Sequence, residues 1–203
     1  MRKWGIMALV QKNGKKPKLG IDLDNTLANS DAVFRELLKE HYGINLSRED
    51  ETRRMEEATG LSTEEVVQLV GEGWATPDRI FPLDKNLTYF LSSLHEIYEI
   101  YIVTSNHQAP LEVIESWLKR NNVPYDKLVI AEGNEYKTNY VDVLVDDSLE
   151  CVEPHAKAGK QAVLLARPYN KNFNERRIAR FETWEEIFNY FQIYYAFVLS
   201  KRS

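Results

Sequence analysis

Two carboxylates that stand two residues apart at the end of an apolar run are the clearest candidates for chemistry in this sequence. The run from Leu19 to Ile21 leads into Asp22 and Asp24, with Thr26 close behind. Side chains at positions i and i+2 of an extended chain point to the same side, so both carboxylates would face one small volume. At an effective dielectric of about 20, unit charges about 4 Å apart repel by about 4 kcal/mol. We therefore expect a cation, a shared proton or an open, solvated mouth at this point.

Two further apolar runs, at residues 100–103 and 141–145, also end in polar side chains. These side chains are Thr104, Ser105, Asn106, Asp146 and Asp147. Runs that are apolar on both faces are typical of parallel strands covered by helices on both sides. In such sheets, ligands bind beyond the carboxyl ends of the strands. The three strand ends are therefore predicted to form one site.

The elements that must position this site follow from hydrophobic periodicity. From residue 85 onward, expected strands at 100–103, 128–131, 141–145 and 162–165 alternate with helical patterns, the last of which starts at a capping box of Thr183 and Glu186. This alternation predicts an α/β fold, a Rossmann-like parallel sheet covered by helices on both faces.

The segment 29–84 reads instead as helix without strand. It carries a second capping box, Ser62 with Glu65. We interpret it as a small helical cap inserted after the first strand. Residues 18–28 and 85–203 would then form the catalytic core, and residues 1–17 a peripheral leader.

Composition restricts the possible partners. The 203 residues are 43% hydrophobic and 28% charged, with a formal net charge of −5, which disfavours a nucleic-acid polymer as partner. No apolar run approaches the ~18 residues that a membrane span needs. The single cysteine, Cys151, allows no intramolecular disulfide, and this favours a reducing, cytoplasmic location. The sequence leaves a homodimer open.

Four short motifs resemble those of the haloacid dehalogenase superfamily of phosphohydrolases. They are DLDNT at 22–26, IVTSN at 102–106, Lys137, and LVDD at 144–147, in the order of that family. The helical segment between the first two motifs, the lysine close ahead of the double acid and RPYN at 167–170 narrow the resemblance to the 5′(3′)-deoxyribonucleotidase-like group. Thr26 departs from the pattern, because some members of that group have an aliphatic residue there.

The resemblance implies a Mg2+-dependent phosphomonoesterase. Asp22 would be the nucleophile that forms an aspartyl phosphate, and Asp24 would transfer protons. A second acid suits a phosphatase, since a dehalogenating relative has no alkoxide to protonate. Mg2+ would be held by Asp22, the main-chain carbonyl of Asp24 and Asp146, and it would let the carboxylate approach a phosphate dianion. Asp147 would orient Lys137.

The remaining predicted site residues would bind the substrate. Thr104 and Lys137 would hold the non-bridging phosphate oxygens. Thr26, Ser105 and Asn106 would line the substrate site, and Trp74, in the cap, would stack on a base.

The substrate class is a small phosphorylated molecule, for which a nucleoside monophosphate is the leading prediction. Two alternatives stay open. One is a sugar phosphate or another small phosphomonoester, and the other is a non-catalytic phosphate-binding regulator. For His107 an exposed loop position, and for Arg167 a surface ion pair, are the default interpretations.

Overall fold

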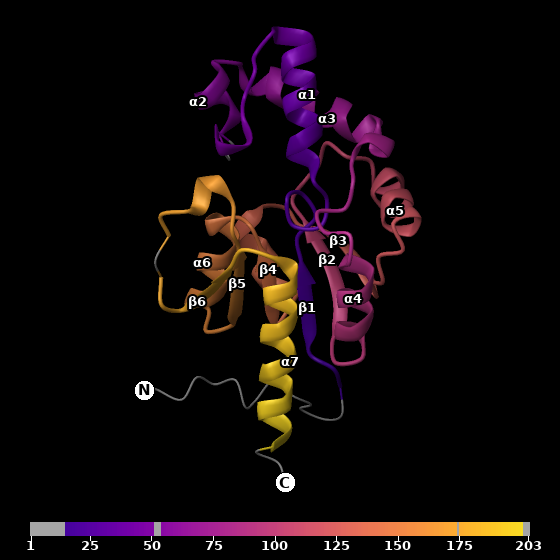
Figure 1. Ribbon diagram of the computed structural model, residues 1–203, viewed down its shortest axis with the longest axis vertical. Helices are drawn as coiled ribbons and strands as arrows, with labels where there is room; N and C mark the ends of the chain where they lie inside the picture. Colours follow the sequence, from indigo (N-terminus) through magenta and orange to yellow (C-terminus); the bar gives the residue numbers. More distant parts are fainter. Residues whose placement is uncertain (1–14, 51–53, 174, 201–203) are drawn as a thin grey trace.

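The computed structural model describes residues 15–50, 54–173 and 175–200, and within this part of the chain the fold is built on one parallel sheet (Figure 1). The six strands are hydrogen-bonded in the order β3-β2-β1-β4-β5-β6. Their bounds are β1 Lys18–Ile21, β2 Glu99–Thr104, β3 Lys127–Ile130, β4 Val143–Asp146, β5 Gln161–Leu165 and β6 Ile178–Phe181. The predicted sheet is confirmed.

The strand β1 lies in the middle of the sheet, between β2 and β4. Ile21 is level with Ile102 of β2 and with Val145 of β4. Gly20 allows the close packing of this strand, because a Cβ atom built on it would lie 2.6 Å from Cγ2 of Val141. The carboxyl ends of the three strands are therefore neighbours at one edge of the sheet.

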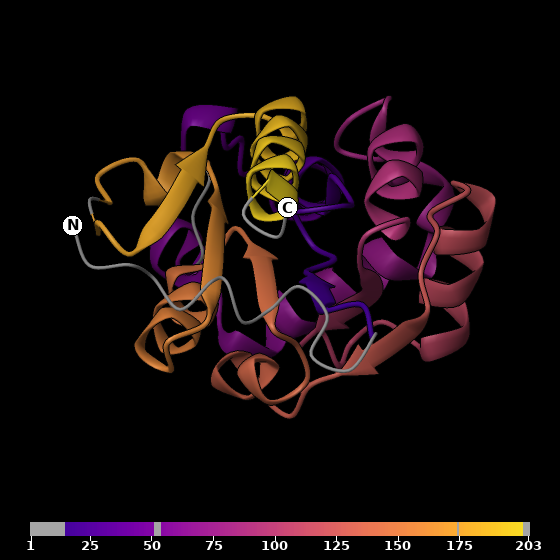
Figure 2. The same ribbon diagram turned by 90° about the horizontal axis from the view of Figure 1, so that it is seen from below.

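Helices cover both faces of the sheet, as Figure 2 shows from below. The helices α4 and α7 pack together on one face, and α6 with the short helix η5 covers the other. The helices of the core are α4 Leu87–His95, α5 Leu111–Arg120, η5 Asn134–Asn139, α6 Leu149–Lys157, η6 Pro168–Asn170 and α7 Trp184–Ser200. Strands with both faces buried explain the continuous apolar runs of the sequence.

The sequence prediction misses β6. This strand, Ile178–Phe181, pairs with β5 at the edge of the sheet, and Arg180 stands in its four residues. An edge strand buries only part of its surface, so its short alternation carried no continuous apolar signal. The other predicted strands and helices of the core are present.

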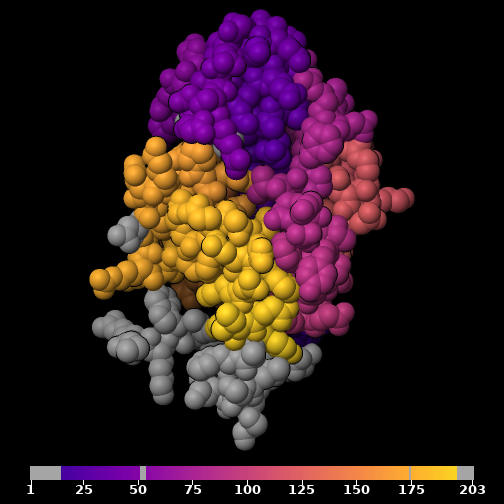
Figure 3. Space-filling model, in the orientation of Figure 1, coloured from indigo at the N-terminus to yellow at the C-terminus, as the bar shows by residue number. Residues whose placement is uncertain are grey.

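The segment 29–84, which we call the insertion, stands beyond the carboxyl ends of the strands (Figures 1 and 3). Its elements are α1 Ser30–Tyr42, η3 Arg48–Asp50, α2 Met55–Thr59, α3 Thr63–Ala75 and η4 Pro77–Arg79. The predicted capping box of Ser62 and Glu65 starts α3. Gly73 lets α3 approach α1, because a Cβ atom at this position would lie 2.6 Å from Cε1 of Phe34.

The structure also bears on the expectations about a membrane span, the cysteine and the leader. Among the described residues no helix is long and apolar enough to cross a membrane. Cys151 is a buried free thiol. Residues 1–14 of the predicted leader lie outside the described residues, while the carbonyl of Pro17 accepts a hydrogen bond from the main-chain N–H of Glu99.

Candidate active site

Three adjacent strands deliver the predicted polar side chains to one place. Asp22 follows β1, Thr104 ends β2 and Asp146 ends β4. All three residues are at least 95% buried, with exposed fractions of 5%, 1% and 0%. The juxtaposition follows from the parallel register, which places the ends of β1, β2 and β4 side by side.

Lys137, from η5, bridges two of these carboxylates. Its Nζ donates to Oδ1 of Asp22 at 2.5 Å and to Oδ2 of Asp146 at 2.9 Å. Burial lowers the pKa of this ammonium group, but the charges of Asp146 and Asp22 outweigh burial, and the pKa ends well above its ordinary value. Lys137 is therefore protonated at neutral pH. The structure brings it to two acids of the site.

At Asp22, burial has a larger effect on the pKa than the attraction of Lys137. Burial raises the pKa of its carboxyl group well above the ordinary range. Lys137 opposes this rise, and the carboxylates of Asp146 and Asp147 add to it. A bound cation would relieve this crowding of like charges, because positive charge favours the ionised carboxylate.

The donor set of the site suits a hard divalent cation. Carboxylate oxygens of Asp22, Asp146 and Asp147 lie within 4.8 Å of one another, and all three residues are buried. Mg2+ prefers oxygen ligands and takes only a few carboxylates. The residues present therefore fit the predicted metal, with Asp147 close enough to join the predicted ligands.

Asp147 has other partners than the sequence predicted. Its Oδ1 accepts from the hydroxyl of Thr26 at 3.2 Å, and its Oδ2 accepts from the hydroxyl of Tyr169. Lys137 donates its hydrogen bonds to Asp22 and Asp146, and the role of Asp147 in orienting Lys137 stays a prediction. Thr26 is fully buried, so it supports Asp147 rather than lining the pocket as predicted.

Asp24 is held from two sides. Nε1 of Trp74, at the end of α3, donates to its Oδ1 at 3.0 Å, and Nδ2 of Asn106 donates to its Oδ2 at 2.9 Å. The Trp74 ring is 0% exposed and packs edge-on against Trp117, with ring centroids 6.2 Å apart. The prediction that Trp74 stacks on a base is wrong for this structure, because its ring has no exposed face. Trp74 is a hydrogen-bond donor to Asp24.

The two residues after Asp24 form a tight turn. Asn25 has φ of 56°, a left-handed conformation that asparagine tolerates better than most residues. Its main-chain carbonyl accepts from Nε of Arg167 at 2.9 Å and also from Nη2, while Nε1 of Trp184 donates to the carbonyl of Thr26 at 2.7 Å. The surface ion pair expected for Arg167 is wrong, because this side chain is 9% exposed and fixes the turn.

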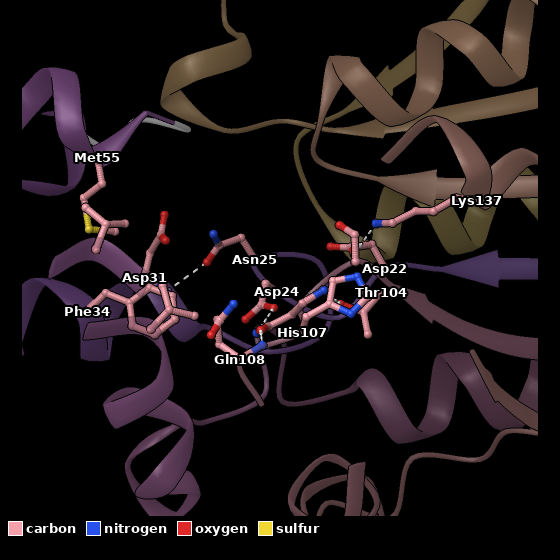
Figure 4. A pocket seen from close by; sticks show the side chains of 14 residues that line it. Asp22, Asp24, Asn25, Asp31, Phe34, Met55, Thr104, His107, Gln108 and Lys137 are labelled. Atoms are coloured by element: carbon pink, nitrogen blue, oxygen red, sulfur yellow. Dashed lines mark hydrogen bonds and ion pairs between the residues drawn. The ribbon is translucent and has the colours of Figure 1, made fainter. Parts of the chain in front are cut away.

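The side chains enclose a pocket of about 270 Å³ (Figure 4). One end is polar and holds Asp22, Asp24 and Lys137, as Figure 4 shows. The other end is lined by side chains of the insertion, namely Asp31, Phe34, Met55, Val66 and Val70. The apolar residues of this set were not predicted to line a pocket, because an apolar side chain at helical spacing predicts core equally well.

The residues that follow β2 form the wall between the two ends. Ser105, Asn106, His107 and Gln108 line the pocket. The hydroxyl of Thr104 accepts from the main-chain N–H of Asn106 at 3.0 Å. The hydroxyl of Ser105 donates to Oδ1 of Asn134 at 2.6 Å, which links this wall to η5.

A buried histidine supports the segment that carries Lys137. Nδ1 of His155 lies 2.7 Å from the hydroxyl of Thr138, and Nε2 lies 3.3 Å from the carbonyl of Asp142. Burial lowers the pKa of His155 to about 4. The neutral ring therefore donates from Nε2 to the carbonyl and accepts at Nδ1 from the hydroxyl.

Comparisons with known proteins agree with this fold. A haloacid dehalogenase-like hydrolase of Streptococcus pneumoniae superposes with a TM-score of 0.61 at 14% identity, covering 87% of this chain and 98% of that one. The hydrolase YfnB of Bacillus subtilis, whose structure was described with bound magnesium, gives 0.57 at 16% identity, covering 88% and 99%. The six-stranded parallel sheet is thus that of the haloacid dehalogenase-like hydrolases.

The sequence assigns the chain to a family within this class. Residues 16–194 match the model of the family described as 5′ nucleotidase, deoxy (pyrimidine), cytosolic type C, and the chain belongs to this family. A nucleotidase of Clostridium acetobutylicum is 25% identical over 111 residues, which are 52% of this chain. The chain matches 57% of the length of that nucleotidase.

Proposed function

We propose that this protein is a Mg2+-dependent phosphomonoester hydrolase that acts on nucleoside monophosphates in the cytoplasm. The convergence of Asp22 after β1, Asp146 at the end of β4 and Lys137 from η5 supports the chemistry. The family match, with its nucleotidase description, supports the substrate class. The apolar end of the pocket supports it too, because a base is a larger apolar surface than a sugar.

In the first half-reaction, an oxygen of Asp22 attacks the phosphorus of the ester. A P–O bond forms to Asp22 while the bond to the nucleoside oxygen breaks, and the leaving alkoxide takes a proton from Asp24. The ammonium of Lys137 and the hydroxyl of Thr104 stabilise the non-bridging oxygens, where negative charge accumulates. Burial of these donors strengthens their interactions with the charged phosphoryl group.

In the second half-reaction, water attacks the phosphorus of the aspartyl phosphate. Asp24 accepts a proton from this water, the bond between phosphorus and Asp22 breaks, and phosphate leaves. Asp22, Asp146 and the main-chain carbonyl of Asp24 would hold Mg2+, which when bound would supply positive charge that favours attack of a carboxylate on a phosphate dianion. Asp147 stands beside this set and offers a further carboxylate.

The insertion would act as a cap that contacts the part of the substrate beyond its phosphate group. Phe34, Val66 and Val70 offer an apolar wall, and Asp31 and Gln108 offer polar groups beside it. In this proposal, Phe34 rather than Trp74 contacts the base. Phe34 lines the pocket, and Figure 4 shows it with Asp24 and Asp31.

A phosphatase panel tests this proposal. We expect phosphate release from nucleoside monophosphates with Mg2+, loss of activity in EDTA, and its return on adding Mg2+. Asp22→Asn should lower kcat by more than a thousandfold, on the order of the loss of an essential nucleophile. Equal turnover of sugar phosphates and nucleotides would contradict the substrate class, and full activity of Asp22→Asn would contradict the covalent mechanism.

A further inference from the structure

A buried guanidinium outside the catalytic pocket lacks a carboxylate partner. Arg167 is 9% exposed, and its Nε and Nη2 both donate to one oxygen, the main-chain carbonyl of Asn25. Across the described ranges, no Asp or Glu oxygen lies within 4.0 Å of its nitrogens. Buried charges are normally paired, because burial costs several kcal/mol per ion. One carbonyl dipole does not neutralise a full charge.

Arg167 lines a second cavity, of about 300 Å³, on the other side of the turn at Asn25. Two arginines of the insertion line it as well, Arg35 from α1 and Arg48 from η3. An adjoining hollow shares Arg48 and Arg167 and adds Lys171 and Arg180. Five basic side chains therefore surround this space.

Fewer acidic than basic side chains line these cavities among the described residues. Asp84 and Glu182 are the two that line the cavities among the described residues. Glu182 is already bonded to Arg180, whose Nη1 lies 2.5 Å from its Oε1. A basic excess at this place is notable in a chain whose formal net charge is −5. The cavity is thus a local anion-attracting region in an acidic protein.

We propose that this cavity is a second anion site, which binds a phosphate group, either free or carried by a small molecule. Guanidinium groups offer a planar fork of donors that matches phosphate oxygens, and Arg167 keeps an Nη1 group that its bonds to Asn25 do not use. The site is distinct from the catalytic pocket, where carboxylates dominate, and it goes beyond the proposed function.

The position of the site gives it a mechanical role. It lies where η3 of the insertion packs against η6 of the core, the junction between the indigo-to-purple and orange parts of Figure 3. An anion bound here joins Arg48 on the insertion to Arg167 on the core. Arg167 also holds the turn that follows Asp24. Binding of an anion in this cavity would therefore affect both the position of the insertion and the conformation of this turn.

Titration calorimetry with pyrophosphate, in EDTA, tests the proposal. Without a divalent cation the acids of the catalytic pocket repel an anion, so binding reports on the second site. We expect saturable one-to-one binding to the wild type and an affinity at least about tenfold lower for Arg48→Gln, which loses about 1.4 kcal/mol or more. Arg48 is exposed, so its replacement should leave the melting temperature unchanged. Arg177→Gln, an exposed arginine outside the cavity, is the matched control.

Two further arms complete the design. Orthophosphate and a nucleoside monophosphate, titrated in the same way, distinguish a free from an esterified phosphate as the preferred ligand; Arg48→Gln should weaken whichever binds. Asp22→Asn should leave pyrophosphate affinity within about twofold of wild type. Absence of binding to the wild type, or binding that Arg48→Gln leaves unchanged, would overturn the second site. Neither result bears on the proposed phosphatase activity, because no turnover is measured.

Discussion

Asp24 is the residue at which the insertion and the core meet. One of its carboxylate oxygens accepts from Trp74 in α3, and the other accepts from Asn106 after β2. A proton-transferring group must be held in a productive direction, and two donors from different elements fix this direction. The position of α3 is thereby linked to the position of the carboxyl group that we propose to be catalytic.

Trp74→Phe removes this donor while it keeps an aromatic ring in the core. A hydrogen bond to a charged group contributes about 1.5–3 kcal/mol, so kcat should fall by about tenfold or more. KM should change little, because the ring does not line the pocket. Steady-state kinetics on a nucleoside monophosphate measures both constants.

Trp117→Phe is the matched control for this substitution. It removes an indole N–H that donates to the carbonyl of Ile80 at 2.8 Å, away from the acids. We expect a lower melting temperature with kcat within about twofold of wild type, since the lost bond is structural. A similar loss of kcat in both variants would show that Trp74 acts through packing alone.

Among the elements, the contact between α1 and α3 shapes the apolar end of the pocket. Gly73→Ala would place a Cβ atom 2.6 Å from Cε1 of Phe34, and this ring must then move. Overpacking of this kind costs about 1–3 kcal/mol. Because Phe34 lines the pocket, we expect KM for nucleotides to rise several-fold, with a smaller change in kcat.

Gly71→Ala tests the same helix without this clash. The nearest neighbour of a Cβ atom there, the main-chain oxygen of Gln108, is 4.0 Å away. Alanine favours helix over glycine by about 1 kcal/mol, so this variant should melt at a higher temperature with KM unchanged. A rise in KM for Gly71→Ala as large as that for Gly73→Ala would contradict the assignment of Phe34.

The segment that carries Lys137 should make the fold sensitive to acid. His155 has a pKa of about 4 in the folded protein, against 6.5 ordinarily, so the unfolded chain binds more protons between these values. Its contribution to stability is therefore present above pH 6.5 and is lost as the pH falls towards 4. The difference corresponds to roughly 3 kcal/mol at most.

Urea unfolding between pH 7 and pH 5 measures this loss. His155→Gln should be less stable than wild type at pH 7, yet its unfolding free energy should fall less on acidification. His41→Gln, which replaces an exposed histidine paired with Glu72, should keep the wild-type dependence. An unchanged pH dependence in His155→Gln would show that other groups are responsible.

The sheet and the acids were predictable from sequence for a common reason. Apolar runs that stop abruptly at Asp22, Thr104 and Asp146 indicate both a strand and the carboxyl end at which its polar side chain lies. The short edge strand β6 and the partners of Trp74 and Arg167 were not predictable. Those two side chains donate to groups 50 and 142 positions away, and local pattern carries no information on such long-range contacts.

At the scale of the whole molecule, the buried acids would link stability to the predicted metal. A cation that binds only the folded state stabilises it, by about 2.7 kcal/mol at a hundred times the dissociation constant. Mg2+ should therefore raise the melting temperature of the wild type in a saturable manner. Asp146→Asn removes one predicted ligand and should abolish most of this increase. An equal increase in both proteins would place the metal elsewhere.

The tryptophan fluorescence of the chain can report on events at the site. Three of its four tryptophans, Trp74, Trp117 and Trp184, are buried, and their indole N–H groups donate to Asp24, Ile80 and Thr26. Indole emission responds to nearby charge and to solvent, so the Trp74 contribution should change with any displacement of α3 relative to Asp24. Unlabelled protein in a stopped-flow fluorimeter would then display substrate binding and release in real time.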